Sequence, residues 1–220
     1  MKAERTCDLL IVGGGVGGCA AALAAASLGR RVVLTEETDW LGGQITAQAV
    51  SALDEHARIE SFGGTDSYYR FRNGIRDYYR AHYPLTPQAR QAKRLNPGNR
   101  GYLFHEPRVA LAVLEAMFAP HRAARRVEIL VEHRAVRAEA GGDRVLAVEL
   151  ADLRHGGSVV VHAPFVIDAT ELGDLLPLTG TEYVSGAESQ ADTGEPHAVT
   201  GAPQPENVQA FTVSFIVDYL

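Results

Sequence analysis

Three glycines near the N-terminus and a glutamate after them have the spacing of a nucleotide-binding site. Gly13, Gly15 and Gly18 stand in a G-x-G-x-x-G register between an apolar segment and an alanine-rich one. The first glycine permits a sharp turn, the second lets a diphosphate approach the backbone, and the third lets helix and strand pack closely. Glu36 closes the next apolar segment, where a carboxylate can accept hydrogen bonds from both ribose hydroxyls. Together these residues predict a site for an adenine dinucleotide.

The elements that must position these residues follow from the pattern of apolar side chains. Strands are expected at 7–12 and 31–36, with a helix at 16–28 between them that ends at Gly29. The unpaired N–H groups and the positive dipole end of that helix would face the diphosphate. An ordinary turn between strand and helix, with no ligand, is the alternative interpretation. The order of strand, glycines, helix, strand and acid favours the ligand site.

The rest of the chain predicts further helices and short strands. A segment rich in arginine and tyrosine carries an expected helix, and its paired tyrosines are interpreted as packing residues. A later stretch broken by glycine pairs predicts an antiparallel meander, and a polar segment near the end predicts a linker. The expected elements are helices at 66–82 and 107–119, strands at 127–131 and 165–168, the meander at 134–163, the linker at 185–207 and a strand with period-two alternation at 208–220.

Composition excludes several classes of protein. A net charge of −6 without a basic run argues against nucleic acid or anionic lipid as the main partner. The two cysteines are expected to be buried thiols, and no metal-ligand set or hydrolytic nucleophile motif occurs. No apolar run reaches membrane-spanning length, and the start lacks the apolar core of a signal peptide, so a cytoplasmic location is expected.

Further motifs carry a resemblance to a known family. Leu41-Gly42-Gly43-Gln44, Ile167-Asp168-Ala169-Thr170 and Gly173-Asp174, with the glycine motif and Glu36, resemble FAD-dependent oxidoreductases. The superfamily is that of glutathione-reductase-like flavoproteins, near the fumarate reductase flavoprotein branch. The resemblance implies an α/β fold in which a Rossmann-like FAD-binding domain (1–44 and 105–184, with the antiparallel β-meander) carries an inserted helical lobe (45–104). Family members are longer, so residues 185–220 would be a linker and the first strand of an incomplete substrate domain.

The resemblance implies FAD as cofactor and assigns roles to matching positions. Glu171 departs from the family, because relatives usually have glycine there. The implied cofactor-binding residues are Gly13, Gly15 and Gly18 at the diphosphate, Glu36 at the ribose, Gly42, Gly43 and Gln44 on the flavin side, Ala135 and Val136 at the adenine, Ala169, Thr170, Gly173 and Asp174 closing over the dinucleotide, and Val16, Gly17 and Glu37 beside them.

The expected activity is flavin-dependent redox chemistry in which a hydride passes between a small organic substrate and the flavin. Glu36 and Glu37 disfavour NADP, because two carboxylates repel a 2′-phosphate and no arginine stands beside them in the sequence. Two alternatives stay open. One is a non-catalytic FAD- or nucleotide-binding subunit that needs a partner polypeptide as its catalytic half. The other is an NAD-dependent dehydrogenase. No catalytic acid or base is assigned.

Overall fold

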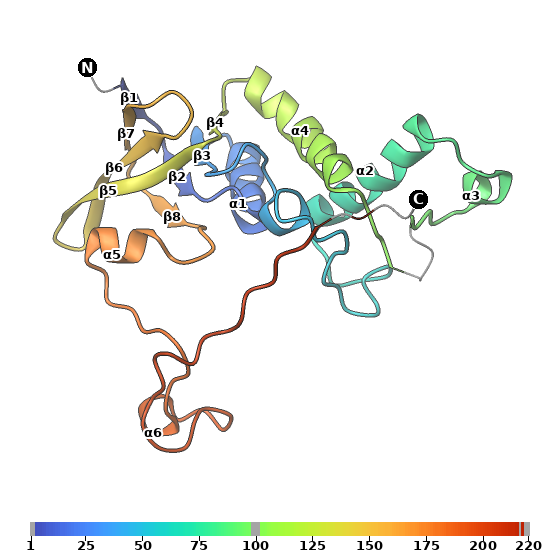
Figure 1. Cartoon of the computed structure of the whole chain (residues 1–220). Helices are drawn as coiled ribbons and strands as arrows, with labels where there is room; N and C mark the ends of the chain where they lie inside the picture. Colours follow the sequence, from blue (N-terminus) through green and yellow to red (C-terminus); the bar gives the residue numbers. More distant parts are fainter. Residues whose placement is uncertain (1–2, 98–101, 216, 218–220) are drawn as a thin grey trace.

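The computed structural model describes residues 3–97, 102–215 and 217. A parallel sheet lies at the centre, in the order β4-β3-β2-β8. A second sheet, in the order β1-β7-β6-β5, is antiparallel except where β1 runs parallel to β7. The strands are β1 (Ala3–Thr6), β2 (Leu9–Val12), β3 (Val32–Thr35), β4 (Val127–Leu130), β5 (His133–Gly141), β6 (Arg144–Asp152), β7 (Ser158–His162) and β8 (Val166–Asp168) (Figure 1).

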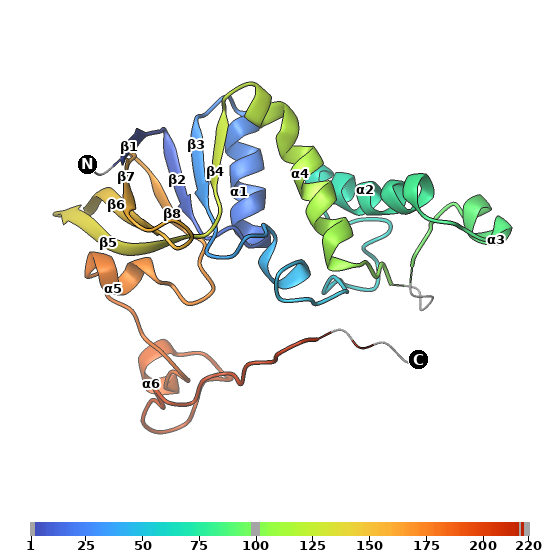
Figure 2. The ribbon, with the colours of Figure 1, turned by 45° about the horizontal axis from the view of Figure 1, so that its top comes forward.

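Helices cover one face of the parallel sheet and the meander covers the other, as Figure 2 shows. Alternate residues of β2 separate the two cores: Ile11 packs with α1, whereas Leu10 and Val12 pack with the meander. A strand buried on both faces must be apolar throughout, which explains the unbroken run at 9–12. The helices are α1 (Val16–Ser27), η1 (Gly43–Ile45), α2 (Asp66–His82), α3 (Pro87–Gln91), α4 (Pro107–Ala123), α5 (Leu175–Thr179) and α6 (Gln190–Thr193).

Small side chains let α1 lie close to the sheet. Cys19, Ala22 and Ala26 are fully buried against it, and Gly29 follows the helix with a φ of 81°, as predicted.

Cys7 and Cys19 are both free and buried, which confirms their prediction as buried thiols. Burial raises the pKa of the Cys19 thiol to about 12, so this cysteine stays protonated and unreactive.

The segment 45–104 shares its core with the helical side of the sheet. Phe71 and Ile75 of α2 belong to the same buried cluster as Val109 and Val113 of α4 and the inner face of α1. Thr65 begins α2 by accepting a hydrogen bond from the Tyr68 N–H, which fixes the start of the helix where the sequence predicts it.

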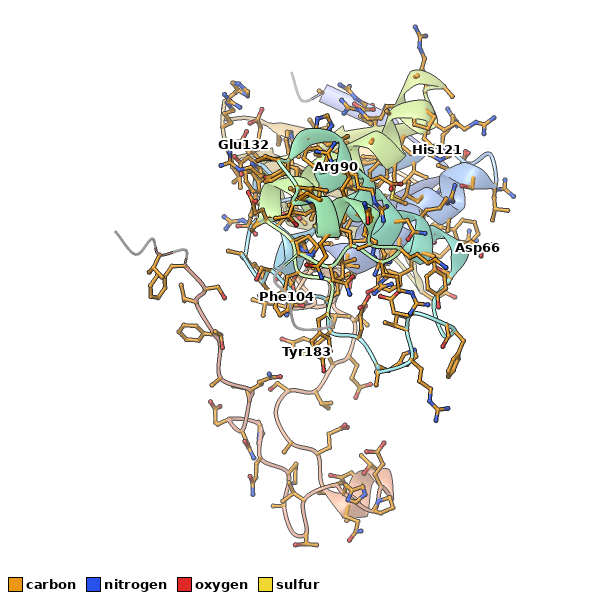
Figure 3. All side chains as sticks on the ribbon, turned by 90° about the vertical axis from the view of Figure 1, so that its right-hand side faces the viewer. Asp66, Arg90, Phe104, His121, Glu132 and Tyr183 are labelled. Carbon is orange, nitrogen blue, oxygen red and sulfur yellow. The ribbon has the colours of Figure 1, made fainter. Side chains whose placement is uncertain are left out.

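The C-terminal segment differs from its prediction. Residues 208–215 and 217 form no strand, and their large side chains are exposed, Phe211 by 89% and Phe215 by 78%. Beyond Tyr183 the chain leaves the body, passes through α6 and runs on outside the body (Figure 3). An alternating apolar pattern gives a strand only where another strand accepts its backbone hydrogen bonds, and no described strand lies beside this segment.

Within the described residues no helix combines the length and hydrophobicity that crossing a bilayer requires.

Candidate functional site

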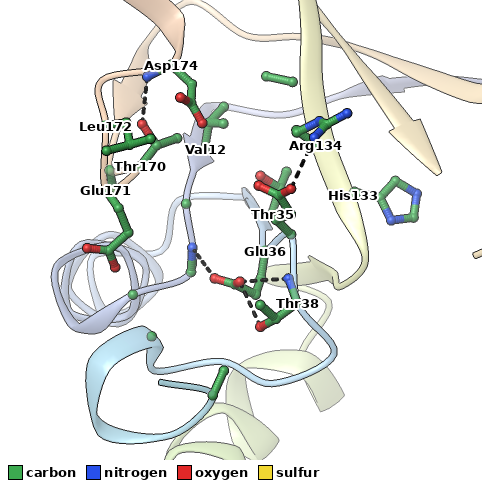
Figure 4. A pocket seen from close by; sticks show the side chains of 18 of the residues that line it. Val12, Thr35, Glu36, Thr38, His133, Arg134, Thr170, Glu171, Leu172 and Asp174 are labelled. Carbon is green, nitrogen blue, oxygen red and sulfur yellow. Dashed lines mark hydrogen bonds and ion pairs between the residues drawn. The ribbon is translucent and has the colours of Figure 1, made fainter. Parts of the chain in front are cut away.

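A cleft of about 230 Å³ lies at the carboxyl ends of β2 and β3, the place where open parallel sheets bind ligands (Figure 4). It brings together many of the residues that the sequence predicts. These are Gly13, Gly15, Glu36, Glu37, Gly43, Ala135, Ala169, Thr170 and Asp174. Other predicted residues do not line it: Val16, Gly17, Gly18, Gly42, Gln44, Val136 and Gly173.

The three motif glycines have two different tasks. Gly13 has a φ of 105°, and a Cβ there would overlap the Ala169 carbonyl. A Cβ at Gly18 would overlap the Gly13 carbonyl, so both positions need glycine for the chain to fold. Gly15 has an ordinary φ of −61°. A Cβ on Gly15 would have the Glu171 Oε1 atom, at 3.3 Å, as its nearest neighbour, so it would point into the cleft. Gly15 therefore keeps the cleft open.

The Glu36 carboxylate ties two loops together at the edge of the cleft. Its Oε2 accepts a hydrogen bond from the Gly14 N–H at 3.0 Å, and its Oε1 accepts from the N–H and the hydroxyl of Thr38, each at 2.8 Å. The residue is 8% exposed. A carboxylate has about four acceptor positions, so three internal donors leave capacity for a further one. The predicted contact with ribose hydroxyls stays a prediction.

An arginine distant in sequence reaches the same end of the cleft. Arg134 of β5 forms an ion pair with Glu37, with Nη1 and Oε1 3.3 Å apart. No arginine stands beside the two glutamates in the sequence, but the fold supplies one, because β5 follows β3 by about a hundred residues and begins next to its end. Glu37 engages this guanidinium, and both side chains are about half exposed. The pairing could not be read from local spacing.

The loop after β3 brings only one of its three predicted residues, Gly43, to the lining of the cleft. Gly42 has a φ of 107°, and its N–H donates to the Gly14 carbonyl at 2.8 Å, which joins the two glycine loops. The short helix η1 then carries Gln44 outward, where it is exposed, and brings Gln48 to the cleft instead. Sequence reasoning missed Gln48, because a single 3₁₀ turn leaves no periodic signal.

The loop after β8 is organised by Asp168. Its Oδ1 accepts from the Thr170 N–H at 3.0 Å and hydroxyl at 2.7 Å, and its Oδ2 accepts from the Leu175 N–H at 2.9 Å. The Thr170 hydroxyl in turn accepts from the Asp174 N–H at 2.8 Å. These bonds hold Thr170 and Asp174 at the cleft.

Across the cleft, β5 shifts register between Ala135 and Arg137, so Ala135 lines the cleft and Val136, 42% exposed, does not.

The charges of the cleft are mostly negative. Its acidic residues are Glu36, Glu37, Glu171 and Asp174, against the single arginine Arg134. An anion would therefore be attracted by backbone rather than by side chains, through the first-turn N–H groups of α1. The bare backbone at Gly15 and Gly43 gives such an anion access, so the residues fit a diphosphate between the two glycine loops.

Three solved structures show similar folds. The flavin-dependent monooxygenase PieE, in complex with FAD and substrate, has a TM-score of 0.55 at 19% identity over 84% of this chain. THI4 from Thermovibrio ammonificans has a TM-score of 0.52 at 20% identity over 84% of this chain. RebC soaked with K252c has a TM-score of 0.51 at 18% identity over 80% of this chain. The chain spans 34% of PieE, 67% of THI4 and 36% of RebC. These likenesses confirm the predicted Rossmann-like fold.

The sequence comparison identifies the family. No curated protein matches the chain. A family model described as FAD dependent oxidoreductase matches residues 8–218, which is nearly the whole chain. The chain therefore belongs to the FAD-dependent oxidoreductase family, whose cofactor is FAD.

Proposed function

We propose that the cleft at the ends of β2 and β3 binds the adenosine diphosphate half of FAD. The observation that carries this proposal is the meeting of two glycine loops, joined by the Gly42–Gly14 hydrogen bond, beside the buried Glu36 carboxylate. This arrangement offers bare backbone to a diphosphate and an acid to a neighbouring sugar. Family membership supports the same cofactor.

Each side of the cleft would hold a different part of the cofactor. The backbone at Gly15 and Gly43, with the N-terminus of α1, would bind the diphosphate. Glu36 would accept a hydrogen bond from the ribose, and the main chain at Ala135 would meet the adenine. Thr170 and Asp174, fixed by the Asp168 hydrogen bonds, would close the opposite wall.

When bound, FAD supplies redox chemistry, and we propose hydride transfer between its ring and a small organic substrate. The described residues of the chain would bind and orient the cofactor. Purified chain should show the absorbance bands of an oxidised flavin or gain them on titration with FAD, and organic donors should bleach them. A colourless chain that binds NAD in a fluorescence titration, and not FAD, would favour the NAD-dependent alternative and overturn this proposal.

A second function, an FAD-binding subunit without activity of its own, is favoured by the size of the cleft. Sites for drug-sized ligands have volumes of about 300–1,000 Å³, and FAD is larger than most such ligands. The cleft measures about 230 Å³, so the described residues enclose part of the cofactor. If the chain binds FAD but donors bleach it only after a second polypeptide is added, the subunit function is correct.

Replacing Glu36 tests the sugar end of the cleft. Glu36→Ala should weaken FAD binding by about 1–3 kcal/mol, because it removes a charged hydrogen-bond acceptor. It also leaves the Gly14 N–H without its internal partner, so the free energy of unfolding should fall as well. Titration of flavin fluorescence and urea unfolding measure the two effects separately. Asp39→Asn, an exposed carboxylate outside the cleft, is the matched control. Unchanged FAD affinity in Glu36→Ala would remove Glu36 from the site.

A further inference from the structure

The Glu171 carboxylate lies over the two glycines that the diphosphate needs. Its Oε1 is the nearest atom to a Cβ built on Gly43, at 3.0 Å, and to one built on Gly15, at 3.3 Å. The α-carbon of Gly15 itself lies 3.1 Å from that same Gly43 Cβ position, so the two glycines and the carboxylate converge on one spot. Figure 4 shows the side chain directed from the β8 loop toward the start of α1.

Glu171 differs from its neighbours in how it is held. Asp168 and Thr170 are fixed by hydrogen bonds within the loop. Glu171 is exposed, and among the described residues its carboxylate makes no hydrogen bond or ion pair. The side chain can therefore rotate about its own bonds while the loop stays in place.

The Glu171 carboxylate makes no hydrogen bond to α1, but it lies beside a place that favours negative charge. The first N–H groups of α1 have no partners within the helix, and the dipole of the helix favours negative charge there. One anion at a time can occupy the space between the glycine loops. A carboxylate carried by the chain is present at all times, whereas the cofactor has to arrive from solution.

We propose that Glu171 competes with the diphosphate of FAD for the N-terminus of α1 and thereby weakens FAD binding. This inference rests on the proposed function of the cleft. FAD enters when the Glu171 side chain rotates out toward solvent, and the rotated carboxylate still repels the nearby diphosphate. The chain would therefore hold an exchangeable FAD, with an affinity set by the residue at position 171.

The competition predicts a gain of affinity on removing the charge. Glu171→Gln keeps the shape of the side chain and should bind FAD and ADP at least about fivefold more tightly, which is the factor for one fully hydrated like-charge contact. Glu171→Gly, which also clears the space, should gain more. Salt screens the repulsion. The ratio between the FAD dissociation constants of the wild type and Glu171→Gln should therefore shrink as ionic strength rises.

Titration calorimetry with ADP and flavin fluorescence with FAD, each at low and high salt, measure these affinities. Glu182→Gln, an exposed carboxylate after α5 and outside the cleft, controls for the change in net charge and should bind like the wild type. Equal or weaker binding by Glu171→Gln overturns the competition, and weaker binding would mean that Glu171 contacts the bound cofactor. If the wild type and both Glu171 variants all fail to bind FAD and ADP, the proposed function itself fails.

Discussion

Gly15→Val should abolish FAD binding while the chain stays folded. The φ of −61° at Gly15 is open to any residue, and a Cβ there meets a flexible carboxylate rather than backbone. The added side chain would fill the space between the glycine loops and block backbone contacts to the diphosphate. Charged hydrogen bonds contribute about 1.5–3 kcal/mol each, so losing two should weaken binding by more than about a hundredfold.

Absorbance of the purified variant and an FAD titration test this result, and far-ultraviolet circular dichroism checks the fold. Ala24→Val adds a branched side chain at an exposed position on the same helix and serves as the control for helix propensity. The control should bind FAD like the wild type. A Gly15→Val variant that still purifies yellow would show that the diphosphate lies elsewhere.

Local patterns were sufficient to predict the three longest helices among the described residues, α1, α2 and α4, and the shorter helices were not predicted. The sequence predicts helices at 16–28 and 66–82, and the structure has them at Val16–Ser27 and Asp66–His82. Both begin at signals that act within one turn, the glycine motif before Val16 and the Thr65 cap. The helix at Pro107 extends past the predicted end at 119, through Pro120 to Ala123. Proline favours a helix end without enforcing one, because neighbouring packing can outweigh the lost hydrogen bond.

Long-range pairing explains what the sequence could not predict. The strand β1, Ala3–Thr6, is exposed and has no apolar alternation, and it forms because β7 offers a parallel partner. Residues 208–217 have the alternation and no partner strand among the described residues, so they do not form a strand. A strand forms only where two segments pair through their backbones, and a local sequence pattern describes only one of the two.

The same distinction applies to the cleft. Gly13, Gly15 and Glu36 were predictable because a single strand–helix–strand unit brings them together. Arg134 and Gln48 enter the cleft from segments whose approach depends on sheet order and on a 3₁₀ turn. Glu171 was visible as a departure from the family pattern, but its position over Gly15 and Gly43 follows from the pairing of β8 with β2. Sequence identified the residues, and topology determined which of them meet.

A buried cluster of charges stabilises the segment between β3 and α4. Arg72, whose side chain is 2% exposed, donates to both oxygens of Glu55 at 2.6 and 3.0 Å and to Glu60 at 2.9 Å. Hydrogen bonds from Arg72 and Arg76 lower the pKa of Glu60 to about 2. A lowered carboxyl pKa stabilises the fold at pH values above the ordinary value of 4.5, and this contribution is lost as pH falls from there toward 2.

Arg72→Met should lower the free energy of unfolding by about 3–5 kcal/mol, because the Glu55 carboxylate, 4% exposed, would remain buried without its cation. Urea unfolding at pH 7 measures the loss. Arg70→Met, at an exposed position of the same helix, should stay within about 0.5 kcal/mol of the wild type. The stability of Arg72→Met should also fall less steeply than that of the wild type below pH 4.5. A loss below about 1 kcal/mol would mean that water reaches Glu55 and that the cluster contributes no more than a surface ion pair.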